Sequence, residues 1–126
     1  MIAFIRSRMA SFGHAFNGLW YVLRTQRNAW IHAAATVGVI LLGGWLALPG
    51  RDWAVLCVSI AIVWTAEVLN TAIEAVVDLA SPVHHPLAKV GKDVGAAAVL
   101  IAAATAVLVG LLILVPPLLD KIAAWF

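Results

Sequence analysis

Three long apolar segments dominate the chain and decide what it can fold into. Residues 30–48, 53–80 and 93–115 are mostly apolar, and a helix needs about 20 residues to cross a bilayer. Of the 126 residues, 64% are hydrophobic and 11% are charged. Soluble domains are typically about 45–50% apolar and about 25% charged. The sequence therefore predicts an all-α integral membrane protein, in which residues 1–126 form a single domain with three transmembrane helices.

The first 26 residues predict a helix of another kind. Apolar side chains recur there at steps of three and four, which lines one face of a helix, and they are Ile5, Met9, Phe12, Phe16, Leu19 and Leu23. We expect an amphipathic surface helix over about 1–26 that lies in the membrane interface. An ordinary helix packed on the bundle is the alternative. The interrupted apolar pattern is not typical of a secretory signal peptide.

Prolines and polar residues mark the predicted ends of the spans. The sequence predicts a turn at residues 49–52 and a polar loop at residues 81–90, and it predicts that Pro116 and Pro117 end the third span. The second helix, of about 28 residues and about 42 Å, is longer than the hydrocarbon core. Its C-terminal end is therefore expected to tilt or to project into the aqueous interface.

The basic residues predict the orientation of the spans. They gather before the first span and between the second and third, at Arg6, Arg8, Arg24, Arg27, Lys89 and Lys92. Only Arg51 and Lys121 lie at the opposite ends. By the positive-inside rule, the N-terminus and the 81–92 loop are cytoplasmic and the C-terminus is outside. The chain has no basic run interleaved with aromatic residues, so a nucleic-acid partner is not expected.

A stripe of polar side chains interrupts the second span. At 100° per residue, Glu67, Glu74 and Asp78 fall within about 40° of one another, and Asn70 lies about 60° to one side. Ionisable groups in hydrocarbon are costly unless they face protein, water or a counter-ion. The stripe therefore indicates a functional site. Asp78, the member nearest the loop, has the alternative of a merely interfacial or helix-end residue.

A second polar group follows across the predicted loop. It consists of His84, His85, Lys89, Lys92 and Asp93. For Asp93 taken alone, an alternative role is to cap the third span. For Lys92, an alternative role is that of a positively charged anchor at the membrane interface. The two adjacent histidines have no second ligand pair at metal spacing, so a structural zinc site is not expected.

Further residues and motifs limit the kinds of binding site that the chain can form. His32, one turn into the first span, is expected to be a packed or interfacial histidine. The glycine motifs that cradle phosphates in soluble nucleotide-binding proteins do not occur in the chain. Acidic residues beside basic ones at a membrane surface still allow Mg²⁺ and nucleotide phosphates to be held by charge.

The polar residues fall in a pattern that resembles the prokaryotic diacylglycerol kinase family. The resemblance runs from about Ser11 to Pro117, and its motifs are Glu67-Val-Leu-Asn70-Thr71-Ala-Ile-Glu74, Val77-Asp78, His85 and Lys92-Asp93-Val-Gly-Ala-Ala-Ala-Val99. The segments 27–32 and 84–89 look more like the undecaprenol kinase branch of the family.

This resemblance implies a lipid kinase that uses ATP and Mg²⁺. It implies a homotrimer in the bacterial cytoplasmic (inner) membrane, with active sites shared between subunits at the cytoplasmic interface. The implied substrate is a membrane lipid alcohol, with undecaprenol favoured and diacylglycerol, which would give phosphatidic acid, as the alternative. From another class, a small proton-coupled transporter would also use membrane carboxylates. A structural membrane subunit would leave the acidic stripe unexplained.

The resemblance also assigns roles to single residues. Glu67 matches the general base, Glu74 and Gln26 match metal ligands, and Asn70 and Asp78 match supporting polar residues. The implied nucleotide-binding residues are His14, Gln26, Glu74, His84, His85, Lys92 and Asp93. Two positions depart from the family pattern, since Gln26 stands in place of a glutamate and Ala10 in place of a basic residue.

Overall fold

The computed structural model describes residues 1–83 and 85–125, with the backbone alone described for residues 2–5 and 7. The described residues form the helices α1 (Ile2–Thr25), α2 (Arg27–Trp45), α3 (Gly50–Ala80) and α4 (Pro86–Ala123). By length and composition, α2, α3 and α4 are each able to cross a membrane. The prediction of an all-α protein with three spans is thus confirmed.

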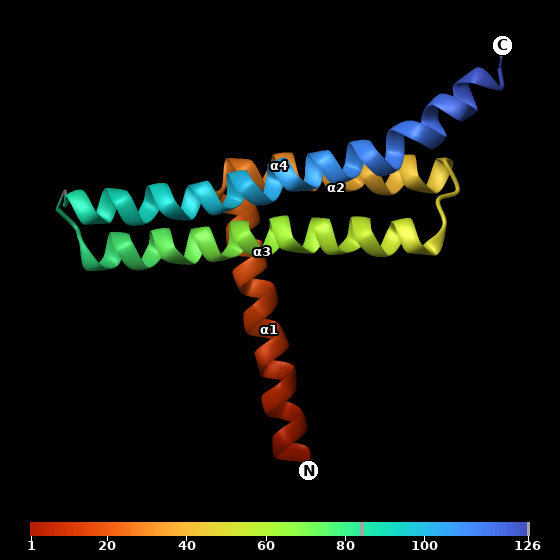
Figure 1. The fold of residues 1–126 in the computed structure, drawn as a ribbon. Helices are drawn as coiled ribbons and strands as arrows, with labels where there is room; N and C mark the ends of the chain where they lie inside the picture. Colours follow the sequence, from red (N-terminus) through yellow and green to blue (C-terminus); the bar gives the residue numbers. More distant parts are fainter. Residues whose placement is uncertain (84, 126) are drawn as a thin grey trace.

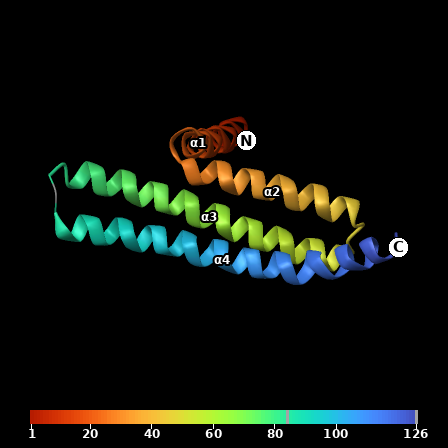
Figure 2. The same cartoon turned by 90° about the horizontal axis from the view of Figure 1, so that it is seen from above.

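The three long helices lie side by side, with α3 between α2 and α4 (Figure 2). α3 and α4 run antiparallel and pack together along most of their length. Figure 1 shows α1 standing roughly perpendicular to this bundle, and the α3–α4 hairpin extending past the point where α2 begins. The part of α3 that carries the acidic stripe therefore lies at and beyond the junction of α1 with α2.

Apolar packing holds the opposite end of the bundle together. Leu48, Leu56 and Leu114 are buried against one another where α2, α3 and α4 converge. The chain turns there between Trp45 and Gly50, so Gly50–Asp52 form the first turn of α3, and the predicted turn at residues 49–52 began too late. An acidic side chain in the first turn, here Asp52, interacts favourably with the positive end of the helix dipole.

The predicted loop before α4 is shorter than expected. α4 begins at Pro86 and not near residue 93. Proline suits the first position of a helix, because a backbone N–H at that position would have no hydrogen-bond partner within the helix. His85 caps the helix, since its Nδ1 accepts a hydrogen bond from the backbone N–H of Leu87 at 3.2 Å. Asp93 lies inside α4, so its alternative as an N-cap was wrong.

The prediction that Pro116 and Pro117 end the third span was also wrong. α4 runs through both prolines to Ala123, and Figure 1 shows the helix bending in this region. An interior proline removes a backbone hydrogen bond and kinks a helix. The segment beyond the bend is held by α2, because Lys121 Nζ donates a hydrogen bond to the carbonyl oxygen of Trp45 at 2.7 Å and lies 4.4 Å from the centre of its ring.

Candidate functional site

The acidic stripe of α3 is covered by neighbouring helices at Glu67 and Asn70, whereas Asp78 at its far end is 65% exposed. Glu67, Asn70 and Thr71 are the buried polar residues of the described chain, and Glu67 is 1% exposed. They are buried because α3 is the central helix of the three, with α2 on one side and α4 on the other (Figure 2). A carboxylic acid in this setting must be satisfied by the side chains that neighbouring helices bring to it.

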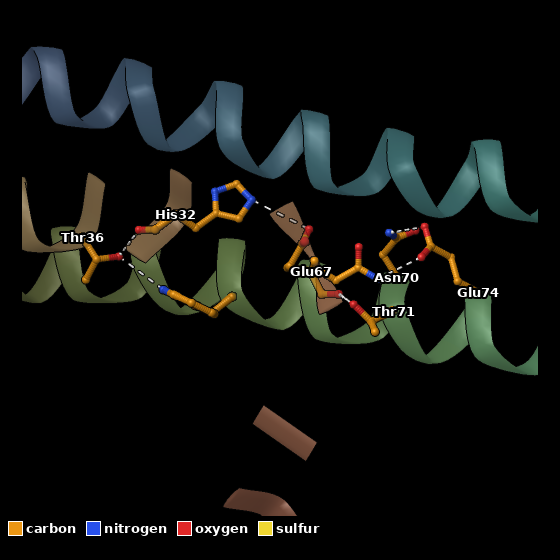
Figure 3. Close-up of polar contacts among 8 residues, drawn as sticks. His32, Thr36, Glu67, Asn70, Thr71 and Glu74 are labelled. Carbon is orange, nitrogen blue, oxygen red and sulfur yellow. Dashed lines mark hydrogen bonds and ion pairs between the residues drawn. The ribbon is translucent and has the colours of Figure 1, made fainter. Parts of the chain in front are cut away.

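Glu74 is held by an amide on each carboxylate oxygen. Asn70 Nδ2 donates to Oε1 at 3.1 Å (Figure 3), and Gln26 Nε2 donates to Oε2 at 3.1 Å. Asn70 reaches Glu74 because residues four apart are neighbours on a helix. Gln26 reaches it because it separates α1 from α2 in an extended conformation. The two amides add no charge of their own, and they fix the direction of the Glu74 carboxylate.

Asn70 lies in close contact with α4 at Gly95. A Cβ at position 95 would overlap the side-chain oxygen Oδ1 of Asn70, so glycine leaves room for this side chain in its observed position. The Oδ1 atom is buried and accepts no hydrogen bond within the described part of the chain. Gly95 belongs to the family motif, and its place opposite Asn70 gives it a packing role in the site.

Glu67 faces a histidine of α2. His32 Nε2 lies 3.8 Å from Glu67 Oε2, and Figure 3 shows the imidazole pointing toward the carboxylate. Sequence reasoning treated His32 as a packed or interfacial residue and missed this contact. The sequence held one indication of a polar role for this residue, because His32 is the sole ionisable residue between positions 30 and 48. Its rotation toward α3 is not encoded in any local pattern.

Two lysine–carboxylate pairs lie at the other end of the stripe. Lys92 Nζ reaches across from α4 to Asp78 Oδ1 of α3 at 2.5 Å. Lys89 Nζ pairs with Asp93 Oδ2 on the same helix, also at 2.5 Å. The Lys92 side chain is 39% exposed and that of Lys89 is 77% exposed. The structure thus brings Lys92 to the acidic stripe and leaves Asp93 on the outer side of α4.

The remaining predicted residues are not brought together with Glu74 inside one chain. His14 is exposed on α1, twelve residues before Gln26 and so about 18 Å away along the helix. His85 is exposed and caps α4. His84 lies outside the described residues. Ala10, which replaces a basic residue of the family pattern, is exposed on α1.

Glu74 is the residue on which magnesium binding at this site would depend. Within residues 1–83 and 85–125, no group of three or more His, Cys, Asp and Glu side chains forms a metal cluster. Mg²⁺, however, is commonly held by one or two carboxylates together with substrate phosphates and water. Glu74 supplies one carboxylate, and Gln26 retains its side-chain carbonyl oxygen. These residues fit an ion shared with a nucleotide and do not form a complete protein cage.

A comparison with known proteins identifies the family. The family model described as prokaryotic diacylglycerol kinase matches residues 13–114. The chain belongs to the prokaryotic diacylglycerol kinase family. The resemblance inferred from the motifs around Glu67, Glu74 and Lys92 is therefore confirmed.

Relatives in this family carry two different names. The chain is 44% identical over 108 residues to the undecaprenol kinase of Bacillus subtilis, which covers 86% of this chain and 88% of that protein. It is 46% identical over 113 residues to the diacylglycerol kinase of Synechocystis, covering 89% of this chain and 65% of that protein. It is 39% identical over 103 residues to the diacylglycerol kinase of Escherichia coli K12, covering 76% of this chain and 79% of that protein.

Proposed function

We propose that this chain is a membrane lipid kinase that transfers the γ-phosphate of ATP to the hydroxyl group of a lipid alcohol. The observation that carries this proposal is the placement of a buried carboxylate, Glu67, about two helical turns from a second one, Glu74, whose two oxygens are held by amides. Family membership supplies the reaction class.

Glu67 is the general base of the proposed reaction. A lipid hydroxyl is a weak nucleophile, and a positioned carboxylate accepts its proton as the phosphoryl group moves. The O–H bond breaks toward Glu67 while the lipid oxygen bonds to the γ-phosphorus. The bond from that phosphorus to the bridging oxygen breaks, and its electron pair leaves with ADP. The burial of Glu67 among apolar helices suits a substrate that arrives from the lipid.

Glu74 and Lys92 serve the nucleotide. Glu74, with the carbonyl oxygen of Gln26, would hold Mg²⁺ together with the ATP phosphates. When bound, the ion neutralises the charge of the phosphates and of the transferring group. Lys92 supplies a cation at the same end of the hairpin, where Asp78 holds it in the described structure. His14, His84, His85 and Asp93 remain proposed nucleotide contacts.

Undecaprenol is the proposed lipid, with diacylglycerol as the alternative. The identities to the Bacillus undecaprenol kinase and the Synechocystis diacylglycerol kinase are nearly equal, at 44% and 46%, so overall similarity does not separate the two lipids. The preference rests on segment 84–89, whose sequence HHPLAK looks more like the undecaprenol kinase branch.

We also propose a homotrimer in the bacterial inner membrane. A cavity of about 510 Å³ on the outer side of α3 and α4 is lined by Asn70, Gly95 and exposed apolar residues that include Leu69 and Ile73. A second copy packed on this face would contact the site directly. Ala98 also lines this cavity, and small side chains favour close helix packing in a membrane.

The surface helix and the orientation complete the proposal. α1 stands across the bundle axis (Figure 1) and exposes Phe12 and Phe16, which supports a position in the membrane interface. With the N-terminus and residues 81–85 cytoplasmic, the hairpin end that carries Lys92 faces the compartment that holds ATP.

Radiolabel transfer tests this function. Purified protein in mixed micelles receives ATP labelled in its γ-phosphate, with undecaprenol or diacylglycerol at equal mole fraction, and extracted lipids are counted. We expect label in both lipids or in undecaprenol alone, with the larger kcat/KM for undecaprenol. Label in neither lipid contradicts the kinase, and a clear preference for diacylglycerol contradicts the lipid assignment alone.

A further inference from the structure

We infer that His32 of α2 is a positioning residue for Glu67, which fixes one carboxylate oxygen so that the other receives the proton of the lipid hydroxyl. This rests on the proposed function, in which Glu67 is the general base. The observation behind it is that His32 Nε2 and Glu67 Oε2 face each other at 3.8 Å across two helices that both span the membrane (Figure 3).

Both atoms are buried and otherwise unpaired. Within the described chain, neither His32 Nε2 nor Glu67 Oε2 has a hydrogen-bond partner, and the side chains are 12% and 1% exposed. Buried polar atoms are normally satisfied, so two that face each other form a natural pair. Other polar groups near Glu67 are engaged elsewhere. The hydroxyl of Thr71 donates to the backbone carbonyl of Glu67 at 2.9 Å, and Asn70 donates to Glu74.

The imidazole is itself held in place by α3 and α2. The ring of Trp64 packs edge-on against it, with ring centres 6.4 Å apart at 69°. Trp64 Nε1 donates to the hydroxyl of Thr36 at 3.2 Å, and that hydroxyl donates to the backbone carbonyl of His32 at 2.7 Å. Trp64 thus contacts both the ring and the turn of α2 that carries it, which fixes the direction of Nε2.

The distance of 3.8 Å leaves one small movement to be made. A hydrogen bond between these atoms needs about 2.9 Å, and a cavity of about 530 Å³ between the three helices borders the imidazole. Glu67 does not line this cavity, so the pair closes by a small adjustment of the two side chains toward each other. Once His32 holds Oε2, the carboxylate is fixed with Oε1 free for the lipid hydroxyl, and fixed geometry of this kind raises the rate of the chemical step.

The competing explanation is that the pair only ties α2 to α3. In that case, loss of His32 would lower stability only while Glu67 is present, and any substitution that keeps the helices together would leave turnover intact. In our reading, the effect of His32 requires the Glu67 carboxylate and falls on kcat, because the residue acts on the base and touches neither substrate.

The first test compares two substitutions of His32 in the lipid kinase assay. Glutamine keeps an N–H donor near the position of Nε2, and leucine keeps the bulk without a donor. We expect H32L to lower kcat about tenfold or more, and H32Q to stay within about threefold of the native value. The KM values for ATP and lipid should change by less than about twofold in both variants. S59A is the matched control, since Ser59 borders the same cavity and bonds to the backbone of its own helix.

The second test repeats the His32 substitution in a variant that lacks the Glu67 carboxylate. In an E67Q background, H32L should cause no further loss of turnover, because there is no carboxylate left to position. If H32L lowers kcat equally in both backgrounds, or if H32Q fails as completely as H32L while remaining folded, the positioning role is wrong.

A third measurement does not depend on activity. The side-chain nitrogen resonances of the four histidines are recorded in isotope-labelled protein and assigned by single substitution. E67Q should shift the His32 resonance, and D52N should leave it unchanged. An unshifted His32 resonance overturns the pairing. A native protein that labels no lipid, but shows this shift, contradicts the proposed kinase and not the pairing.

Discussion

The side-chain amide of Gln26 donates a hydrogen bond to Oε2 of Glu74 at 3.1 Å, across 48 positions of the sequence. This contact joins the junction of α1 and α2 to the acidic stripe of α3. Because glutamine is neutral, Glu74 is the single anionic side chain in this contact. A metal ion shared with ATP would therefore find one protein carboxylate here and one carbonyl oxygen.

The substitution Q26E tests whether Gln26 is a metal ligand. A second carboxylate beside Glu74 repels it when no metal is bound and adds an anionic ligand when Mg²⁺ is present. We expect half-maximal activity at a Mg²⁺ concentration about fivefold lower, since an added ionic contact at a hydrated site is worth about 1 kcal/mol. N28D adds the same charge at an exposed position of α2 and should leave the curve unchanged. Superimposable Mg²⁺ titrations of native protein and Q26E mean that Gln26 merely ends the surface helix.

The contact between Gly95 and Asn70 predicts a sharp steric effect. A methyl group at position 95 overlaps Asn70 Oδ1 but lies 3.9 Å from the Cα of Asn70, so G95A should displace this side chain, destabilise the protein by about 1–3 kcal/mol and lower kcat by moving the amide away from Glu74. G91A is the matched control. A Cβ there meets Val77 Cγ2 at 3.6 Å, an ordinary contact. G95A should unfold at a lower temperature in detergent and turn over more slowly than G91A. If the two variants behave alike, Gly95 does not hold the Asn70 side chain in place.

The assignment of Glu67 as base predicts a loss confined to chemistry. E67Q preserves size and removes the proton acceptor, so kcat should fall at least about 10²-fold. Binding of a fluorescent ATP analogue should stay within about twofold, because Glu67 lies about 10 Å along α3 from Glu74. D52N, at the opposite end of the same helix, is the control. Near-native turnover of E67Q would remove Glu67 from the mechanism.

Much of this site follows from local rules. The 100° repeat of an α-helix puts Glu67, Asn70 and Glu74 near one face of any helix that contains them. The length of the second apolar segment predicts that its C-terminal end tilts or projects into the aqueous interface, and in the structure the α3–α4 hairpin extends past the start of α2 (Figure 1). These features depend on residues within one helix, so the sequence was sufficient.

The features that escaped prediction are long-range. His32 meets Glu67 only because α2 and α3 pack with a particular rotation, and no pattern inside either helix records it. Pro116 was expected to stop a helix by a local rule, yet α4 continues past it, with contacts to Trp45 holding the far side. The bond from Gln26 to Glu74 likewise depends on how α1 and α2 meet.

The orientation of the spans is open to a labelling experiment. In a background without Cys57, D52C should react with an impermeant thiol reagent in intact cells. V83C should react only after permeabilisation, because the positive-inside rule makes residues 81–92 cytoplasmic. Both positions lie near helix ends of the described structure, which keeps the thiols outside the hydrocarbon. The reverse pattern would put Lys92 on the side without ATP and would contradict the kinase.

Lys89 and Lys92, near the start of α4, should differ in their effect on ATP binding. Lys92 pairs with Asp78 across the helices at the acidic stripe, whereas Lys89 pairs with Asp93 on the exposed side of α4. Replacing Lys92 removes a cation and leaves Asp78 as an uncompensated anion beside the proposed phosphate site. A charge-assisted hydrogen bond contributes about 1.5–3 kcal/mol, so K92Q should raise the KM for ATP by about tenfold or more.

K89Q is the matched control for this comparison. It removes the same charge three residues away, at a side chain that is 77% exposed and paired within its own helix. Surface pairs of this kind contribute about 0–1 kcal/mol, so the KM for ATP should rise by less than about threefold. K92R should retain most of the affinity, because the charge remains although the donor geometry changes. If K89Q and K92Q raise the KM equally, net charge at the hairpin end governs nucleotide binding, and the contact between Lys92 and Asp78 has no special place in the site.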